Sequence, residues 1–144
     1  MEAFTTGPKV NFGRVTGSDP GILVVSRDSA FLDSLRVRCS DIDPLRFQRV
    51  ETGRSALDSV EAREVRLALV DETVVDIAAD HLVYLLHTLK RDLPILFLTA
   101  SPSLHQERAA RRSGALLYAP KGDWDLIQKA LSHYSSGGKK RVGG

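Results

Sequence analysis

The sequence contains one cysteine, few aromatic residues and no long apolar segment. Cys39 has no partner for an internal disulfide and cannot alone build a zinc site, so we expect a small buried apolar residue. No stretch approaches the roughly 18 consecutive apolar residues that a membrane-spanning helix requires. Residues 1–20 lack the basic-then-apolar order of a secretory signal. These absences favour a cytoplasmic protein that is not associated with a membrane.

A strong excess of either charge is also lacking, since 20 basic and 18 acidic residues leave a formal net charge of +2. Residues 135–144 hold three basic residues and no acid, and residues 1–20 hold two of each sign, so residues 21–134 contain 15 basic and 16 acidic groups. A basic face that grips phosphates is therefore not expected on the domain. We interpret residues 1–20 as a flexible arm, residues 21–134 as the folded domain and residues 135–144 as a flexible basic tail.

Within residues 21–134, short apolar runs alternate with amphipathic stretches. Compact runs of branched apolar residues are typical of strands that are buried on both faces. Strands are expected at Ile22–Val25, Leu45–Val50, Val65–Val70, Ile95–Leu98 and Leu116–Ala119. Apolar residues three or four positions apart indicate helices between them. Helices are expected after a cap at Asp28 or Ser29, over Ser55–Arg63, around Leu82–Leu89, over Leu104–Ser113 and after a cap at Asp123.

This alternation predicts an α/β fold of the flavodoxin-like kind: a five-stranded parallel sheet in the order 2-1-3-4-5, with helices on both faces. In such sheets, ligands and reactive groups lie at the carboxyl ends of the strands. Polar side chains follow four of the five predicted strand ends. They are Ser26, Arg27, Asp71, Thr99 and Lys121.

In this arrangement the chain resembles the receiver domains of two-component response regulators, which are related to the single-domain chemotaxis regulator. The resemblance runs from about Gly21 to Tyr134, with 44 residues from Arg27 to Asp71, 28 more to Thr99 and 22 more to Lys121. It implies a phosphoacceptor at Asp71, a switch hydroxyl at Thr99, a switch aromatic at Tyr118 and the active-site lysine at Lys121.

The chain departs from this pattern directly after the first strand. Receivers normally place two adjacent acids there, which hold Mg²⁺ together with the acceptor aspartate. This sequence has Ser26 and Arg27 at those positions, and Asp28 comes one residue later. Since Mg²⁺ needs hard oxygen ligands, we expect no bound metal or other cofactor and no ordinary phosphorylation cycle on Asp71.

We expect Arg27, assisted by Lys121, to replace the metal electrostatically by pairing with Asp71. Arg27 follows the first strand and Asp71 ends the third, and these strands are neighbours in the predicted order. A guanidinium can bind a carboxylate through two hydrogen bonds. The alternative is that Arg27 points to solvent and Asp71 pairs with Lys121 alone.

These observations favour a divergent, non-enzymatic pseudo-receiver that acts in signal transduction through protein–protein interaction. The alternative is a working receiver that a histidine kinase phosphorylates on Asp71. A third hypothesis, a small-molecule binder at the same strand ends, has no positive support in the sequence.

The expected recognition surface is formed by the fourth helix, the last strand and the last helix, which are also the expected site of a homodimer. Arginine and large aromatic residues are enriched at interface anchors. The candidates are His105, Arg108, Arg111, Arg112 and Trp124. For Trp124 a packed anchor is the alternative, and for the arginines a solvated helix. The four histidines lack paired ligand spacing, so we expect surface residues and no metal site.

Overall fold

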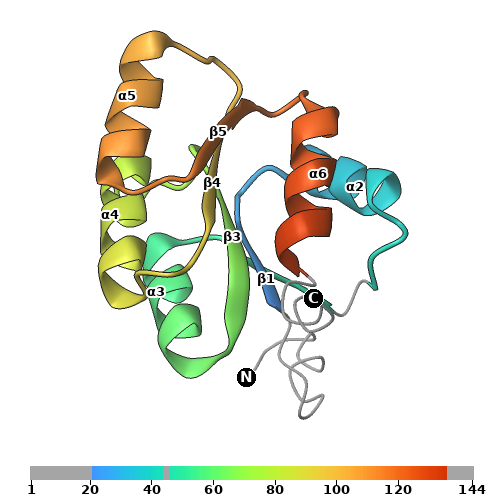
Figure 1. Ribbon diagram of the computed structural model, residues 1–144, viewed down its shortest axis with the longest axis horizontal. Coiled ribbons are helices and arrows are strands. Elements are labelled where there is room, and N and C mark those ends of the chain that lie inside the picture. The colour runs from blue at the N-terminus through green and yellow to red at the C-terminus, as the bar shows by residue number, and fades with distance from the viewer. Residues whose placement is uncertain (1–20, 44–45, 136–144) are drawn as a thin grey trace.

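The computed structural model describes residues 21–43 and 46–135, in which strands and helices alternate strictly (Figure 1). The strands are β1 (Gly21–Val25), β2 (Phe47–Val50), β3 (Val65–Asp71), β4 (Ile95–Thr99) and β5 (Leu117–Pro120). The helices are α2 (Ser29–Arg38), α3 (Gly53–Ala62), α4 (Ala79–Leu89), α5 (Leu104–Ser113) and α6 (Trp124–Ser135). The predicted arm and most of the predicted tail lie outside the described residues.

The strands form one parallel sheet in the order β2-β1-β3-β4-β5, which confirms the predicted topology. β3 and β4 each run one residue further than expected, to Asp71 and Thr99, and β5 ends at Pro120. Asp71 pairs with Leu98 and Thr99 with Pro120 in the ladder. Two of the predicted site residues are therefore held by the sheet itself. Leu45, the expected start of β2, lies outside the described residues.

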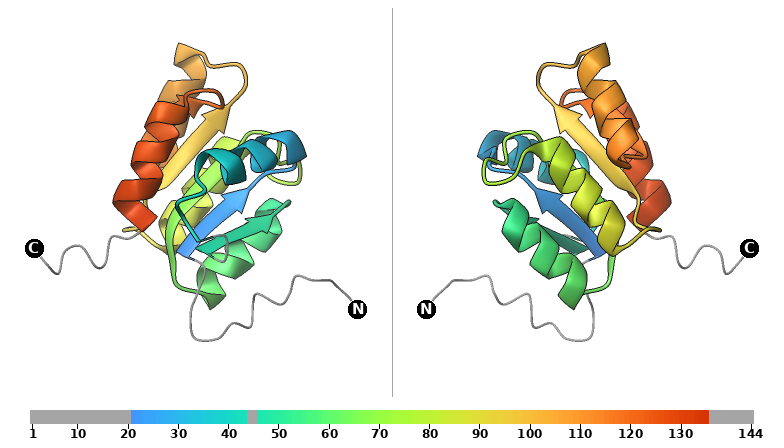
Figure 2. Two further views of the ribbon diagram at one scale, coloured as in Figure 1. Left: turned by 90° about the vertical axis from the view of Figure 1, so that its right-hand side faces the viewer. Right: turned by 90° about the vertical axis from the view of Figure 1, so that its left-hand side faces the viewer.

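Helices cover both faces of the sheet (Figure 2). Side chains of α3, α4 and α5 share one core with Leu23 and Val25 of β1, and those of α2 and α6 share the other with Ile22 and Val24. This division follows from the alternation of side chains along a strand. Cys39 is buried in the second core, as predicted. Among the described residues, no helix combines the length and apolar character needed to cross a membrane.

The start of α3 differs from the expected one. The helix begins at Gly53 instead of Ser55 because Thr52 is its cap, with Thr52 Oγ1 accepting from Ser55 N at 3.0 Å. The carboxylate of Asp76 also accepts from Gly53 N at 2.7 Å and from Arg54 N at 3.0 Å. A distant acid thus satisfies donors that a helix start leaves free, and it fixes the loop between β3 and α4.

The apolar stripe of α4 is shorter than expected. Leu82 and Leu86 are fully buried, but Leu89 at the end of the helix is 45% exposed. Val83 is buried in its place. Leu82, Val83 and Leu86 therefore form the buried face of α4.

The contact between α4 and the end of α5 needs a glycine. Gly114 follows α5 with φ +123°, a value that favours glycine, and a Cβ there would lie 2.7 Å from Cγ of His87. Gly114→Ala should lower the free energy of unfolding by about 1–3 kcal/mol, through both backbone strain and overpacking. Urea denaturation measures this loss.

Gly122→Ala is the matched control, because nothing lies within 4 Å of a Cβ at that position. The control should change the free energy of unfolding by less than about 0.5 kcal/mol. Equal stabilities for the two variants would contradict the packing described for Gly114.

Candidate functional site

The side chain of Asp71 is fully buried at the carboxyl end of β3. Its Oδ2 accepts from Ser26 Oγ at 2.7 Å and lies 2.9 Å from Lys121 Nζ. Its Oδ1 accepts from Thr73 N at 3.2 Å. A buried carboxylate is costly unless it is paired and hydrogen-bonded, and here three segments of the chain supply the partners. We call Ser26, Asp28, Asp71 and Lys121 the Asp71 cluster.

Lys121 lies between two carboxylates. Its Nζ is 2.6 Å from Asp28 Oδ2 as well as 2.9 Å from Asp71 Oδ2, and it sits 5.4 Å from the centre of the Phe31 ring. Burial acts to lower the pKa of Lys121, but the bonds to Asp28 and Asp71 outweigh it, so the pKa is raised. The hydrogen bond from Lys121, with that from Phe31 N, lowers the pKa of Asp28. The ammonium therefore stays charged.

The predicted ion pair between Arg27 and Asp71 does not form, so that prediction is wrong. Arg27 is exposed, and its backbone N donates to Thr73 Oγ1 at 2.9 Å. Ser26 points inward instead. Because successive side chains of an extended segment point to opposite sides, Arg27 then points outward. The alternative, Arg27 in solvent with Asp71 bound to Lys121, describes the site better, although it omitted the bond from Ser26.

Asp28 is a member of the cluster that sequence reasoning set aside as one residue too late. Its two oxygens have separate roles: Oδ1 caps α2 by accepting from Phe31 N at 3.0 Å, and Oδ2 binds Lys121. The available signal was the acid itself, close behind the first strand. Its capping role was predicted and is confirmed, but its reach to Lys121 was not.

Thr99 is fully buried at the end of β4. Its Oγ1 accepts from Ser101 N at 2.9 Å, and its carbonyl oxygen accepts from Lys121 N at 2.9 Å. It lies at the strand ends as predicted, but its hydroxyl belongs to the β4–α5 loop and not to the carboxylate of Asp71.

Glu72 connects this loop to Tyr118, a link that sequence reasoning missed. Glu72 Oε2 accepts from Ala100 N at 2.8 Å, and Oε1 accepts from Gln106 Nε2 at 3.0 Å. Tyr118, which is 9% exposed and stacks on Phe97, donates its hydroxyl proton to Gln106 Oε1 at 2.6 Å. Burial acts to raise the pKa of Glu72, but hydrogen bonds from Ala100, Gln106 and Thr99 lower it overall.

Comparison with solved structures finds response-regulator receiver domains. A receiver domain protein from Methanospirillum hungatei has 26% sequence identity and a TM-score of 0.67, over 77% of this chain and 90% of that one. The signal receiver domain of an HD domain-containing protein from Pseudomonas fluorescens has 24% identity and a TM-score of 0.68, over 80% and 96%.

A response regulator protein from Burkholderia pseudomallei, solved with a phosphorylated aspartic acid, a calcium ion and citrate, has 20% identity and a TM-score of 0.64, over 84% of this chain and 69% of that one. This chain has the receiver-domain fold. The neighbour at 26% identity supports a response-regulator domain of signal transduction. No protein-family model and no curated protein matches the sequence.

The residues of this receiver fold do not suit the Mg²⁺ site that the resemblance implies. Ser26 and Arg27 occupy the places of two acids, and the ammonium of Lys121 bridges the two carboxylates that remain, Asp28 and Asp71. Mg²⁺ would have to displace a bonded lysine to reach them, with few anionic ligands in return. In the described ranges, no group of three or more His, Cys, Asp or Glu side chains is placed to hold a metal ion.

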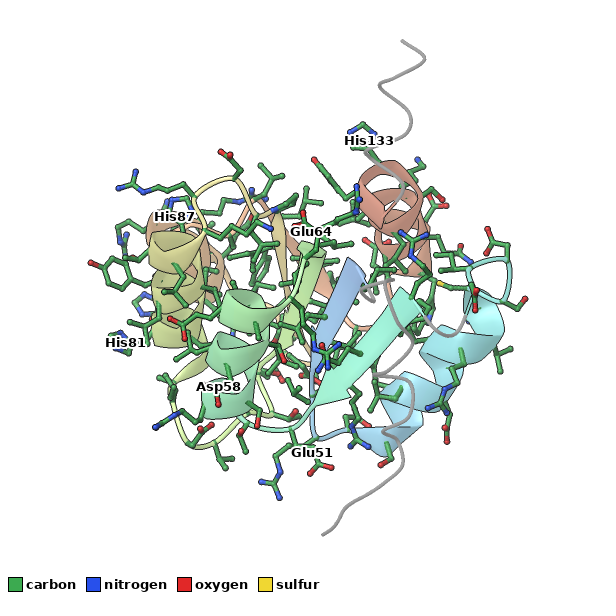
Figure 3. The ribbon with its side chains drawn as sticks, turned by 90° about the horizontal axis from the view of Figure 1, so that it is seen from below. Glu51, Asp58, Glu64, His81, His87 and His133 are labelled. Carbon is green, nitrogen blue, oxygen red and sulfur yellow. The ribbon has the colours of Figure 1, made fainter. Side chains whose placement is uncertain are left out.

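The candidate interface residues fall on two different sides of the fold. His105, Arg108, Arg111 and Arg112 are exposed on α5. Trp124 packs on Phe31 with ring centres 5.4 Å apart and joins α6 to α2, on the other face of the sheet, which supports its role as a packed anchor. The histidines are also scattered: Figure 3 shows His81 and His87 on α4 and His133 on α6.

The ion pair of Asp28 predicts an acid dependence of stability. Because the pKa of Asp28 is lowered in the folded chain, its contribution is complete above the unfolded pKa of about 3.9 and is lost as the pH falls through the folded pKa. Asp28→Asn keeps a good helix cap but cannot titrate. Its free energy of unfolding should therefore fall less than that of the wild type between about pH 5 and pH 3.

Denaturation in urea at several pH values gives the slope of the free energy of unfolding against pH for the wild type and for Asp28→Asn. Asp58→Asn, which removes a carboxylate at an exposed position of α3, serves as the control and should keep the wild-type slope. An unchanged slope in Asp28→Asn would contradict the ion pair with Lys121.

Proposed function

We propose that this chain is a divergent, non-enzymatic receiver domain that acts by binding a protein partner and does not run a Mg²⁺-dependent phosphorylation cycle on Asp71. The observation that supports this is the state of the Asp71 carboxylate, which is fully buried and has hydrogen-bond or ion-pair partners on both oxygens.

Phosphoryl transfer to a carboxylate needs an oxygen that can attack in line and positive charge that neutralises the oxygens of the moving group. Oδ2 of Asp71 is occupied by Ser26 and Lys121, and Oδ1 by Thr73 N. An attacking oxygen would have to leave at least one of these donors. Ser26 supplies a neutral hydroxyl where the family pattern supplies a metal-binding acid, so the cost of that rearrangement is not offset by metal binding.

A working receiver is the second candidate, because the Lys121 ammonium and the Asp71 carboxylate lie 2.9 Å apart and Thr99 ends the adjacent strand. These residue types are the ones that the resemblance assigns to phosphorylation. The two candidates differ in one measurable property: the second requires that Asp71 accept a phosphoryl group and that Mg²⁺ accelerate the step.

Treatment with acetyl phosphate, with and without millimolar Mg²⁺, tests the two candidates. We expect no phosphorylated protein by intact mass, and no saturable Mg²⁺ effect on Trp124 fluorescence. Because a missing metal site is the proposed reason, Ser26→Asp/Arg27→Asp, which restores two acids, is expected to bind Mg²⁺ more tightly than the wild type. Mg²⁺-dependent labelling of the wild type that is lost in Asp71→Asn would overturn the proposal.

For the partner we propose an acidic protein surface that binds α5. His105, Arg108 and Arg112 are exposed at positions that share one face of this helix. Arg111 differs from them, since it donates to Glu107 Oε2 at 3.0 Å and to the Leu116 carbonyl at 3.0 Å. Arg108 and Arg112 are therefore better anchors than Arg111. A second copy of this chain is a less favourable partner, because joining two α5 faces brings like charges together.

Charge reversal on α5 tests this surface. Arg108→Glu/Arg112→Glu should reduce capture of partner proteins after cross-linking in cells by at least about tenfold, without a change in the melting temperature. Arg36→Glu/Arg54→Glu is the matched control, because it makes the same change of net charge at exposed positions on α2 and α3. Equal capture by both double variants would reject the α5 surface.

A further inference from the structure

Donors from Thr99, Ala100 and Gln106 converge on the carboxylate of Glu72 at the end of β4. Ala100 N donates to Oε2 at 2.8 Å, and Gln106 Nε2 donates to Oε1 at 3.0 Å. The two donors come from either side of the loop that leads from β4 to α5. Each oxygen of the carboxylate thus has its own donor, an arrangement suited to a small oxyanion.

The side-chain amide of Gln106 contacts both Glu72 and Tyr118. Its Nε2 faces Glu72, so its Oε1 faces the opposite way, where it accepts from the Tyr118 hydroxyl at 2.6 Å. The Tyr118 oxygen in turn accepts from Ser103 N at 3.0 Å. An amide group has one donor end and one acceptor end, so the orientation that Glu72 imposes on Gln106 turns its acceptor toward Tyr118. This acceptor is closer to the Tyr118 hydroxyl than the other one within reach, the Ser103 carbonyl at 3.3 Å.

We propose that Ala100 N and the Gln106 amide form an oxyanion cradle, that Glu72 fills this cradle from within the chain, and that its occupancy holds Tyr118 in its buried position through Gln106. We call the three side chains, Glu72, Gln106 and Tyr118, the Glu72 relay. Glu72 acts as a positioning residue: it contacts Gln106, and Gln106 contacts the aromatic ring that it fixes.

The backbone places Glu72 for this role. Glu72 N donates to the Leu98 carbonyl at 3.1 Å, which continues the pairing of β3 with β4 by one step and brings the side chain beside Ala100. Asp71, one residue earlier, points into its own cluster and contributes nothing to the relay. The Glu72 relay is therefore formed by this chain alone and depends neither on phosphorylation nor on a partner.

Removal and chemical replacement of the carboxylate test the cradle. In Glu72→Ala, the backbone amide protons of Ala100 and Ser103 should exchange at least about tenfold faster, because a charge-assisted bond that holds the loop is lost. Sodium acetate should restore slow exchange of both amides, whereas sodium chloride at the same ionic strength should not. NMR hydrogen exchange measures both amides in one experiment.

Two further variants separate the cradle from a general loss of packing. In Gln106→Ala the Ser103 amide proton should exchange faster, as in Glu72→Ala. Acetate should not restore slow exchange in this variant, because the link from the cradle to Tyr118 is missing. Glu72→Gln keeps the volume of the side chain and fills the cradle with a weaker, neutral acceptor. The Ala100 amide should therefore exchange faster there, again with no effect of acetate.

Glu107→Ala is the matched control, because this glutamate on α5 pairs with Arg111 and lies outside the relay. It should leave the Ala100 and Ser103 amides unchanged. Two results would overturn the inference. One is unchanged exchange at Ser103 in Glu72→Ala, which would show that the relay does not reach Tyr118. The other is failure of acetate to slow exchange in that variant, which would show that no oxyanion cradle exists.

Discussion

The carboxylate of Asp71 has no exposed surface, and an anion in that position must find its partners within the protein. Ser26, Thr73 and Lys121 supply them from the ends of β1, β3 and β5. Lys121 in turn binds Asp28, the residue that caps α2. One buried charge thus ties three loops and one helix together. Leaving such a charge without its partner typically costs about 3–5 kcal/mol, so this constraint fixes the geometry of the whole edge.

Two acids that are adjacent in the sequence serve separate networks. Asp71 points into the cluster with Lys121, while Glu72 lies along the end of β4 and binds Ala100 and Gln106. The separation follows from the alternation of side chains on an extended chain. The hydroxyl of Tyr118 is thereby linked to Glu72 through Gln106 alone, whereas the contacts that lead from Asp71 to Tyr118 pass through Lys121, Thr99 and Glu72. An aromatic ring at the edge of the sheet is held by a permanent charge of the chain.

The sheet was predictable because four of its five strands are compact apolar runs with short connections, and the right-handed crossover rule together with the resemblance to receiver domains favours the observed order. The site was less predictable, since the partner of Asp71 depends on which of two neighbouring residues after β1 faces inward. A shift of one position exchanges Ser26 and Arg27, and the first position of an extended segment is not visible in the sequence. The relay was harder still, because Glu72 and Gln106 are 34 positions apart and meet through side-chain geometry alone.

Charge balance explains why a lysine can serve this cluster. The pattern that the resemblance implies places three carboxylates around one ammonium, an excess of two negative charges that matches a divalent cation. In this chain Ser26 and Arg27 stand in place of two of those acids, and Asp28 supplies a carboxylate from the next position. Asp28 and Asp71 therefore face Lys121 with an excess of one negative charge. The side chain of Asp28 is 32% exposed and can therefore be solvated by water, whereas that of Asp71 is fully buried and depends on its bonds within the protein. Replacing the two acids by Ser26 and Arg27 thus removes two metal ligands, and even with Asp28 nearby it removes part of the negative charge that a divalent cation would balance.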